Sequence, residues 1–187
     1  MKATPGVFRA CLLGGVMLLP RGPSLGAQAA RASEYQVKAV FLFNFAQFVD
    51  WPASAFPDST APLVIGVLGD DPFGRYLDET VRGETVRGRP LEIRRYQNIE
   101  DVRTCHILFV SPSEGSRLEE ILANLKHRAI LTVGDGAAFA QRGGMIRFIS
   151  ERNKIRMRIN VAAAEAAQLT ISSKLLRAAE IVTPGKP

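Results

Sequence analysis

Residues 63–72 have the sequence LVIGVLGDDP, which is the clearest indication of the fold class in the chain. Residues 63–68 are apolar without a break, apart from one glycine, which is typical of a strand covered on both faces in a parallel sheet. Gly69 to Asp71 then predicts a turn, with Asp71 as a helix cap and Pro72 at the first helical position. The sequence therefore predicts a strand followed by a helix that runs to about Val81.

The alternation of strand and helix continues after this unit. Further strands are predicted over Leu91–Tyr96, Ile107–Val110 and Ala129–Val133. Ser116 and Glu119 have the spacing of a capping box in front of an apolar helical stripe, and a short helix is predicted over 137–141. Strands that alternate with helices predict right-handed βαβ units and a mostly parallel sheet.

The last third of the chain does not follow this alternation of strands and helices. Met145–Ile149 and Lys154–Asn160 predict two strands joined as a hairpin, so one of them should run antiparallel. An Ala-rich helix is predicted over 161–168, and Ser172 or Ser173 should cap a final helix that reaches Ile181.

These elements predict an α/β fold. We expect a single domain over residues 30–187, built as a three-layer sandwich with a mostly parallel sheet and an antiparallel C-terminal hairpin strand. The composition agrees, because 47% of residues are hydrophobic and Gly and Pro number 16 and 11 of 187, which excludes wholesale disorder.

The first 29 residues predict a secretory signal peptide. A basic start is followed by the apolar run 10–19 and then by Ala27-Gln28-Ala29, a small-x-small pattern, so we expect cleavage after Ala29 and a periplasmic protein. A membrane anchor is the alternative, although the run is too short to span a bilayer. Cleavage leaves 21 basic against 18 acidic residues, or +3 instead of +6, which gives little reason to expect a nucleic-acid partner.

A helix rich in aromatic residues opens the expected domain. Ser33 is the predicted cap of a helix over 34–50, ended by Pro52. One stripe at helical spacing contains Val37, Phe41, Phe45 and Phe48, and Trp51 follows at the exit. Two interpretations stay open at this point: burial in the core of the domain, or docking of part of this surface on another protein.

No catalytic motif is visible in the sequence. The two histidines, His106 and His127, lie apart, and neither His106 nor Asp70-Asp71 completes a metal or catalytic set. Cys105 would be the one cysteine of the cleaved chain and begins an apolar run, so it predicts a buried thiol. We expect no enzyme activity, no metal and no cofactor.

A basic row lies on the second strand of the predicted hairpin. Lys154, Arg156 and Arg158 alternate with apolar residues and so share one face. Three cations on one face repel each other unless they are solvated or paired. The row indicates either a solvated edge strand or a contact with an anion or an acidic partner.

Six segments carry a family resemblance. They are EYQVKAVFLFNF leading to VDWP (34–52), VIGVLGDDPFG (64–74), CHILF (105–109), LTVGD (131–135), GGMI (143–146) and ISSKLL (171–176). In this order they resemble the YfiR family of exported bacterial proteins, over about residues 34–182.

The resemblance implies a periplasmic α/β protein without catalytic activity. Characterised relatives repress a membrane-bound diguanylate cyclase by binding its periplasmic domain, which keeps cyclic-di-GMP low. An envelope signal or an outer-membrane partner sequesters the repressor, biofilm formation follows, and such relatives are often dimers. Some members use cysteine pairs, a redox control that Cys105 alone cannot provide. Where the family commonly has Phe-Glu-Ile-Asn, this chain has Met157-Arg158-Ile159-Asn160, which suits a more acidic partner.

Two functional hypotheses follow. The first is a repressor of an inner-membrane signalling protein, which the resemblance implies to be a diguanylate cyclase. Its expected contact residues are Phe41, Phe45, Phe48 and Trp51 for apolar packing and Arg156 and Arg158 for steering. The alternative is a periplasmic module for a small anion or cell-wall fragment, which would use Trp51, Arg158, Ser172, Ser173 and Lys174.

Overall fold

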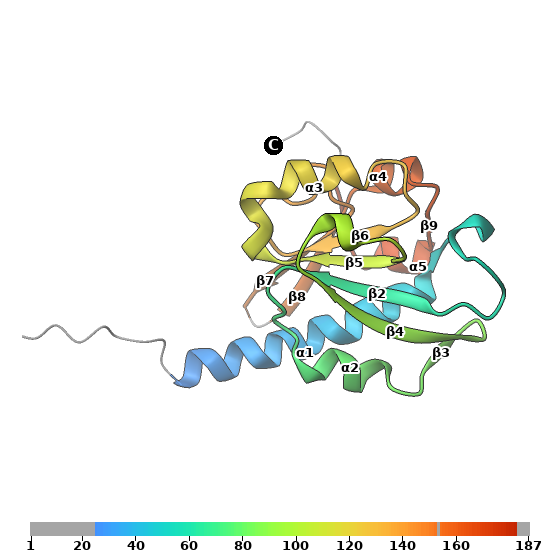
Figure 1. The fold of residues 1–187 in the computed structure, drawn as a ribbon. Coiled ribbons are helices and arrows are strands. Elements are labelled where there is room, and N and C mark those ends of the chain that lie inside the picture. Colours follow the sequence, from blue (N-terminus) through green and yellow to red (C-terminus); the bar gives the residue numbers. More distant parts are fainter. Residues whose placement is uncertain (1–24, 153, 183–187) are drawn as a thin grey trace, which may run out of the picture.

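The computed structural model describes residues 25–152 and 154–182. Its main sheet is formed by β2 (Leu63–Leu68), β3 (Thr85–Val86), β4 (Arg89–Tyr96), β5 (Ile107–Val110), β6 (Leu131–Gly134), β7 (Ile146–Glu151), β8 (Lys154–Ile159) and β10 (Glu180–Ile181). Over the described residues these eight strands have the order β10-β8-β7-β6-β5-β2-β4-β3 (Figure 1).

The sheet is mostly parallel, as predicted. β2 pairs in parallel with β4 on one side and with β5 on the other, and β6 and β7 continue the parallel series. β8 pairs antiparallel with β7, which confirms the C-terminal hairpin. Because β4 and β5 lie on opposite sides of β2, the order of the strands reverses at β2.

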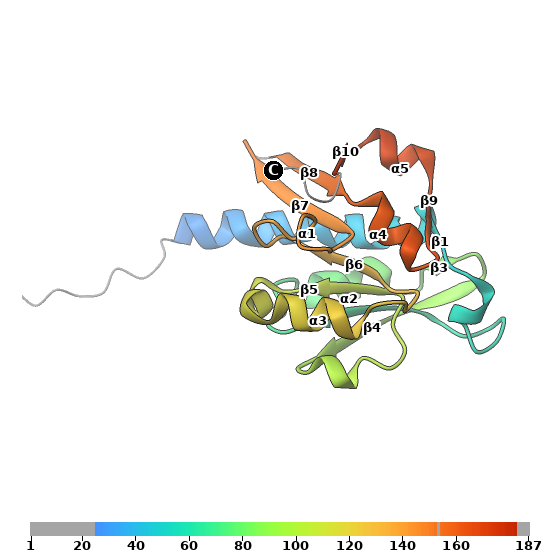
Figure 2. The same ribbon diagram turned by 90° about the horizontal axis from the view of Figure 1, so that it is seen from above.

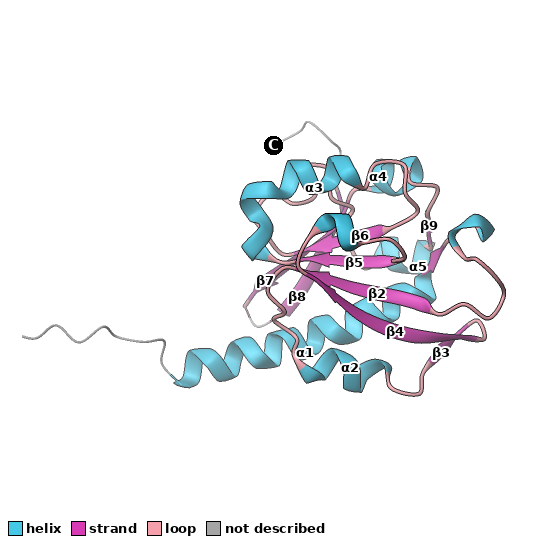
Figure 3. Ribbon diagram, in the orientation of Figure 1, coloured by secondary structure: helices cyan, strands magenta, loops and turns pink. Residues whose placement is uncertain are grey.

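Helices cover both faces of the sheet. They are α1 (Leu25–Phe48), α2 (Arg75–Val81), α3 (Leu118–Asn124), α4 (Val161–Ala166) and α5 (Ser173–Arg177). Figure 3 shows α1 and α2 on one side of the sheet and α3 on the other. A small antiparallel pair, β1 (Val49–Asp50) with β9 (Thr170–Ile171), joins the end of α1 to the C-terminal part of the chain. The predicted three-layer α/β sandwich is therefore confirmed.

The two faces of β2 enter different cores. Ile65 and Val67 pack with α1 and α2, whereas Leu68 packs with the residues around α3. All of β2 is buried, as its uninterrupted apolar run predicts. Gly66 lies where a Cβ would come within 2.7 Å of the Tyr96 ring and 2.9 Å of the Cys105 sulfur, so close packing requires a glycine there.

The long helix α1 differs from the prediction in its start and in its buried face. It begins at Leu25, and Ser33 lies inside it, because the intervening residues Gln28–Ala32 are good helix formers. Its buried stripe is Tyr35, Ala39, Leu42, Phe45, Ala46 and Val49. Of the predicted stripe only Phe45 is fully buried, while Val37 is 45% exposed.

Four other local predictions are corrected. Asp71 accepts the N–H groups of Phe73 and Gly74, so it closes a turn and α2 begins only at Arg75. Ser116 lies in a 3-10 helix over Pro112–Arg117, and α3 begins without a side-chain cap. Residues 137–141 form turns rather than a helix. The last helix stops at Arg177, because Glu180–Ile181 pair with β8 instead.

The described residues contain no helix long and apolar enough to cross a bilayer. Residues 1–24 of the predicted signal peptide lie outside the described part of the chain, and residues 25–29 form the start of α1.

Candidate functional site

The predicted aromatic contacts on α1 are distributed between core and surface. Phe45 has no exposed surface and stacks on Phe148 of β7 at 5.7 Å between ring centres, so it is a core residue and not a contact residue. Phe41 and Phe48 are half-buried and pack against the same core. Among the large apolar side chains of α1 that the structure describes, Val37 and Val40 are exposed, at 45% and 48%.

Trp51 holds the segment after α1 against the sheet. Its Nε1 donates to the His106 carbonyl at 3.2 Å, and its ring meets the His106 ring edge-on. Phe56 stacks on the His106 ring with 4.3 Å between the ring centres, and the Arg89 guanidinium lies over the Phe56 ring. Trp51 and Phe56 line a small hollow of about 230 Å³ here.

His106 and Cys105 are buried at the start of β5. The His106 Nδ1 accepts the Val64 N–H at 3.0 Å, and Nε2 lies 3.1 Å from the Ala55 carbonyl, which can only accept. The ring is therefore neutral with its proton on Nε2, and burial lowers its pKa below the ordinary value. Burial raises the pKa of the Cys105 thiol to about 12, in agreement with the predicted buried thiol.

The basic row of β8 is part of a larger basic face. We define the basic face as Arg147 on β7, Lys154, Arg156 and Arg158 on β8, and Arg177 at the end of α5. Arg147 lies directly opposite Arg158 in the hairpin, so the two share one side of the sheet. Arg156, Arg158 and Arg177 line a hollow of about 550 Å³, together with Glu151 and Glu180.

Charge on the basic face is only partly compensated. Arg158 is paired with Glu180 of β10 at 2.9 Å, which the sequence did not indicate. Arg156 has no ion-pair partner among the residues that the structure describes. The Arg147 Nε is buried and also has no hydrogen-bond partner there. The face therefore keeps excess positive charge at Arg147 and Arg156, although Glu180 compensates Arg158 and Glu151 lies opposite Lys154. Excess positive charge favours contact with an anionic group.

The alternative ligand set is not brought together. Ser172 caps α5 by accepting the Leu175 N–H, and its own N–H donates to the Phe48 carbonyl, so it has a structural role. Ser173 and Lys174 are exposed on α5. Trp51 and Arg158 line different hollows, and β7 and β6 separate the strand of Arg158 from β5, against which Trp51 packs.

A third hollow lies where the strand order reverses. It has a volume of about 610 Å³ and lies at the carboxyl ends of β2 and β5, the position where open α/β sheets bind small molecules. Its wall includes Asp70 and Asp71 after β2, Ser111 after β5, and Arg31 and Tyr35 of α1. With two aspartates against one arginine, this hollow does not fit the small anion expected from the sequence.

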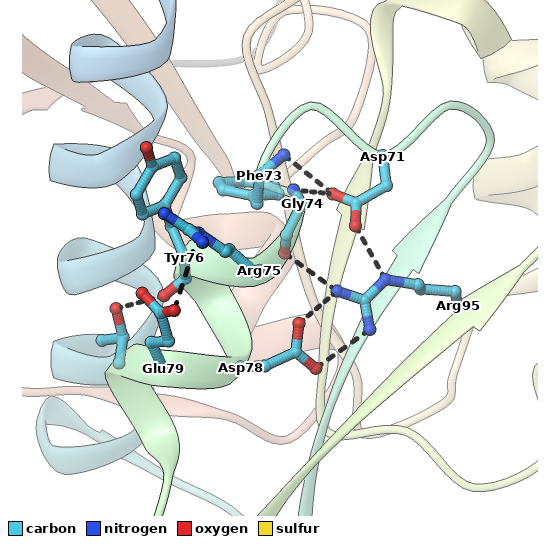
Figure 4. Close-up of polar contacts among 9 residues, drawn as sticks. Asp71, Phe73, Gly74, Arg75, Tyr76, Asp78, Glu79 and Arg95 are labelled. Atoms are coloured by element: carbon cyan, nitrogen blue, oxygen red, sulfur yellow. Dashed lines mark hydrogen bonds and ion pairs between the residues drawn. The ribbon is translucent and has the colours of Figure 1, made fainter.

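Arg95 of β4 fixes one wall of this hollow. Figure 4 shows its guanidinium between two carboxylates: it donates to Asp71 at 2.7 Å and to both oxygens of Asp78, and also to the Gly74 carbonyl at 3.0 Å. The loop after β2 and helix α2 are thereby tied to the same strand. The available sequence signal was weak: Arg95 follows Arg94 and occupies the strand position at which Leu91 and Ile93 are apolar.

A buried ion pair fixes α1 at the other wall. Lys38 is 1% exposed and donates to Asp135, after β6, at 2.6 Å. Asp135 also accepts the Tyr35 hydroxyl at 2.7 Å, and burial together with this carboxylate raises the pKa of Tyr35. Glu34 joins Lys38 to Ser150 of β7. The one available sequence signal was a lysine four residues after a glutamate on an otherwise apolar helix.

The described residues hold no group of three or more His, Cys, Asp or Glu side chains that could bind a metal ion. A model of the YfiR/HmsC-like family matches residues 35–180. The chain belongs to the YfiR/HmsC-like family. Comparison with curated proteins found no match.

The YfiR/HmsC-like match covers most of the described fold. It begins at Tyr35 of α1, which bonds to Asp135 after β6, and ends at Glu180 of β10, so it includes every strand of the sheet up to that residue and the basic face. Membership in this family supports a periplasmic regulator in cyclic-di-GMP signalling and an interaction with a membrane signalling protein, rather than an enzyme.

Proposed function

We propose that this protein binds the periplasmic domain of an inner-membrane signalling protein, a diguanylate cyclase, and represses it, which lowers cyclic-di-GMP and biofilm formation. The observation that carries the proposal is the YfiR/HmsC-like family match over residues 35–180. Sequestration by an outer-membrane protein and formation of a homodimer belong to the same proposal.

The proposed contact surface has an apolar and a basic part. Phe41, Phe48 and Trp51 remain candidates for apolar packing because each keeps some exposed surface, and Val37 adds to them on α1. The basic part is the basic face, with Arg156 as the steering residue, since it is exposed. Uncompensated charge speeds the encounter with an oppositely charged surface.

Repression requires a difference in affinity between two states of the cyclase. A protein that binds the active and inactive states equally tightly shifts no equilibrium. The repressor must therefore bind the inactive state of the periplasmic domain more tightly, and sequestration by a competing partner then releases the cyclase.

A pull-down from detergent-solubilised membranes tests the proposal. The tagged chain beginning at Ala30 should recover a protein that has a periplasmic domain and a cytoplasmic cyclase domain, identified by mass spectrometry. The Arg156→Glu variant should recover less of it, with a weaker dependence on salt. Lys126→Glu makes the same charge change on an exposed residue beyond α3 and should behave like the wild type. Recovery of no membrane signalling protein by the wild-type chain would contradict the proposal.

The hollow of the basic face favours one second candidate, a module for a small anion. Its volume of about 550 Å³ and its three arginines suit a phosphate or carboxylate group. A thermal-shift screen of nucleotides, amino acids and muropeptides tests it, because a ligand that binds the folded state raises the apparent stability. A shift in the wild type that is lost in Arg156→Glu would support this candidate, and no shift with any of them would reject it.

A further inference from the structure

The outer edge of β8 is only half covered. β10 pairs with β8 at Arg158 and Ile159 and no further. In the described chain β10 is the only strand on that side, so β8 from Lys154 to Met157 pairs with β7 alone and has no strand on its outer side. Figure 2 shows the β7–β8 hairpin running on past β10, away from α5.

The backbone of this open segment points its hydrogen-bonding groups outward. The Ile159 carbonyl accepts the Val182 N–H on the β10 side at 2.8 Å, whereas the Asn160 N–H donates inward to Met145 at 2.8 Å. In a strand the N–H and C=O of alternate residues point to the same side. Ile155 and Met157 therefore direct their N–H and C=O groups to the open edge, as Ile159 does.

The chain reaches β8 only at the end of the strand. It comes from α5 and enters β10 through Ala178 and Ala179, so in the described residues no strand follows β8 from Lys154 to Met157 on its outer side. The hollow of about 550 Å³ lies over the basic face, where Ile149 and Glu151 of β7 also line it, and it reaches this edge at Met157.

The side chains along the open edge of β8 determine which residues an added strand should have. Lys154 and Arg156 point to the basic face, and Ile155 and Met157 point to the opposite, apolar face. Glu151 lies opposite Lys154 in the hairpin, and Glu180 is already paired with Arg158. A strand added here meets cations on one face and apolar side chains on the other, so acidic and apolar residues should alternate in it.

We propose that the open edge of β8 accepts an extended acidic segment of the protein partner, which adds to the sheet as a strand beside β10. This inference rests on the proposed function, since it names the part of the partner that docks. Strand addition takes its affinity from main-chain hydrogen bonds and its specificity from alternate side chains. A second copy of this chain fits less well, because edge-to-edge pairing of two β8 strands would bring Lys154 and Arg156 against the same cations.

Hydrogen exchange followed by NMR tests the strand addition directly. The probe is a synthetic peptide of alternating glutamate and valine, added to the chain that begins at Ala30. At saturation the amides of Ile155 and Met157 should exchange about tenfold more slowly, because they become hydrogen-bonded. A peptide of alternating lysine and valine is the control and should change neither amide. Unchanged exchange of both amides with the acidic peptide would overturn the proposal.

A backbone variant separates strand addition from simple charge attraction. In Ile155→Pro the lost N–H points away from β7, so the hairpin ladder is kept while the donor needed by an added strand is removed. Ile155→Val keeps the N–H and is the matched control. We expect about tenfold weaker peptide binding for the proline variant only, about 1.4 kcal/mol, with urea unfolding midpoints that show both variants to be folded. If the proline variant does not fold, the slower exchange of the Ile155 and Met157 amides in the wild type remains the test of strand addition, and Lys154→Glu with Arg156→Glu tests only the charge contact and should also lose the peptide.

The same variants in the pull-down separate this inference from the proposed function. If the wild type and Ile155→Val recover the membrane signalling protein and Ile155→Pro does not, strand addition is supported. Equal recovery by all three would overturn strand addition and leave the repressor proposal standing. Dimerisation in sedimentation that Ile155→Pro abolishes would assign the edge to a second copy instead. Binding to anionic lipid vesicles that Ile155→Pro does not affect would assign the basic face to a membrane surface, and either result overturns the acidic-segment proposal.

Discussion

Lys38 places a charge in the interior of the protein at a point where α1 meets the sheet. Its ammonium group contacts Asp135 at 2.6 Å, and the side chains of the pair are 2% and 9% exposed. A buried charge is stable only when its partners are present, since the attraction must offset the loss of water. One Asp135 oxygen has no hydrogen-bond partner among the described residues, so the cluster depends on the contacts of the other.

We predict that breaking this pair destabilises the fold. Asp135→Asn leaves the buried Lys38 with Glu34 as its acidic partner, and Lys38→Met leaves Asp135 with the Tyr35 hydroxyl but no cation. Each should lower the free energy of unfolding by about 3 kcal/mol, because the buried charge that remains is less well compensated. The double variant should lose less than the sum of the two, as residues in contact are not additive. Urea unfolding measures these values. Asp50→Asn is the control, since its pair with Arg87 is more than half exposed, and should have a much smaller effect.

His106 makes the stability depend on pH. Burial lowers its pKa in the folded state, so the unfolded chain takes up a proton first as the pH falls below about 6.5. The contribution of neutral His106 to the free energy of unfolding is fully present above that pH. Below it, the free energy of unfolding should decrease by up to about 1.4 kcal/mol per pH unit.

Replacement of each histidine in turn tests this prediction. Urea unfolding between pH 8 and pH 5 should show a shallower decrease for His106→Gln than for the wild type. His127 is exposed and has a positive φ of 64°, which asparagine tolerates, so His127→Asn is the matched control. A pH dependence that His127→Asn removes and His106→Gln retains would contradict the assignment.

Among the secondary-structure elements, α1 shows which features the spacing of apolar residues can predict and which it cannot. The spacing of its apolar residues predicted a helix correctly, but the buried face is centred on Tyr35, Leu42 and Val49 instead of on Phe41 and Phe48. Helical periodicity identifies a stripe only when one side of the helix is polar. Here apolar residues surround most of the helix, so the position of the sheet decided which of them became core.

The loop after β2 and helix α2 depend on Arg95. We predict that Arg95→Lys lowers the free energy of unfolding by about 1 kcal/mol and speeds hydrogen exchange at Phe73 and Gly74, since lysine cannot bridge Asp71, Asp78 and the Gly74 carbonyl together. Arg75→Lys is the control: its pair with Glu79 is 3.6 Å long and its side chain is 77% exposed. Equal effects of the two variants would show that the bridge by Arg95 contributes nothing specific.

At the scale of the whole molecule, the predicted signal peptide should be dispensable for the fold. Side-chain contacts between α1 and the sheet begin with Glu34 and Tyr35, downstream of the expected cleavage after Ala29. We predict that protein from the periplasmic fraction begins at Ala30 by mass spectrometry and unfolds cooperatively. Ala29→Arg should block cleavage, since small residues are required at that position. Retention of residues 1–29 by a membrane-bound wild-type protein would indicate an anchor instead.

Features that depend on local order along the chain were predictable from the residues alone. The run of Leu63–Leu68 specified a strand buried on both faces, and the alternation in Lys154–Ile159 specified the hairpin partner of β7. Ser172 was recognisable as a helix cap because capping involves residues three positions apart. These features follow from residue type and spacing within about ten residues, which periodicity and capping rules describe.

Contacts between residues that are distant in the sequence became visible only in the folded chain. Tyr35 and Asp135 are 100 positions apart, Arg147 and Arg177 join the row of β8 from other elements, and β10 covers only part of that strand. Such contacts depend on strand order and register, which the spacing of apolar residues does not encode. For this reason the fold class was predictable, whereas the buried ion pair, the basic face and the open edge of β8 were not.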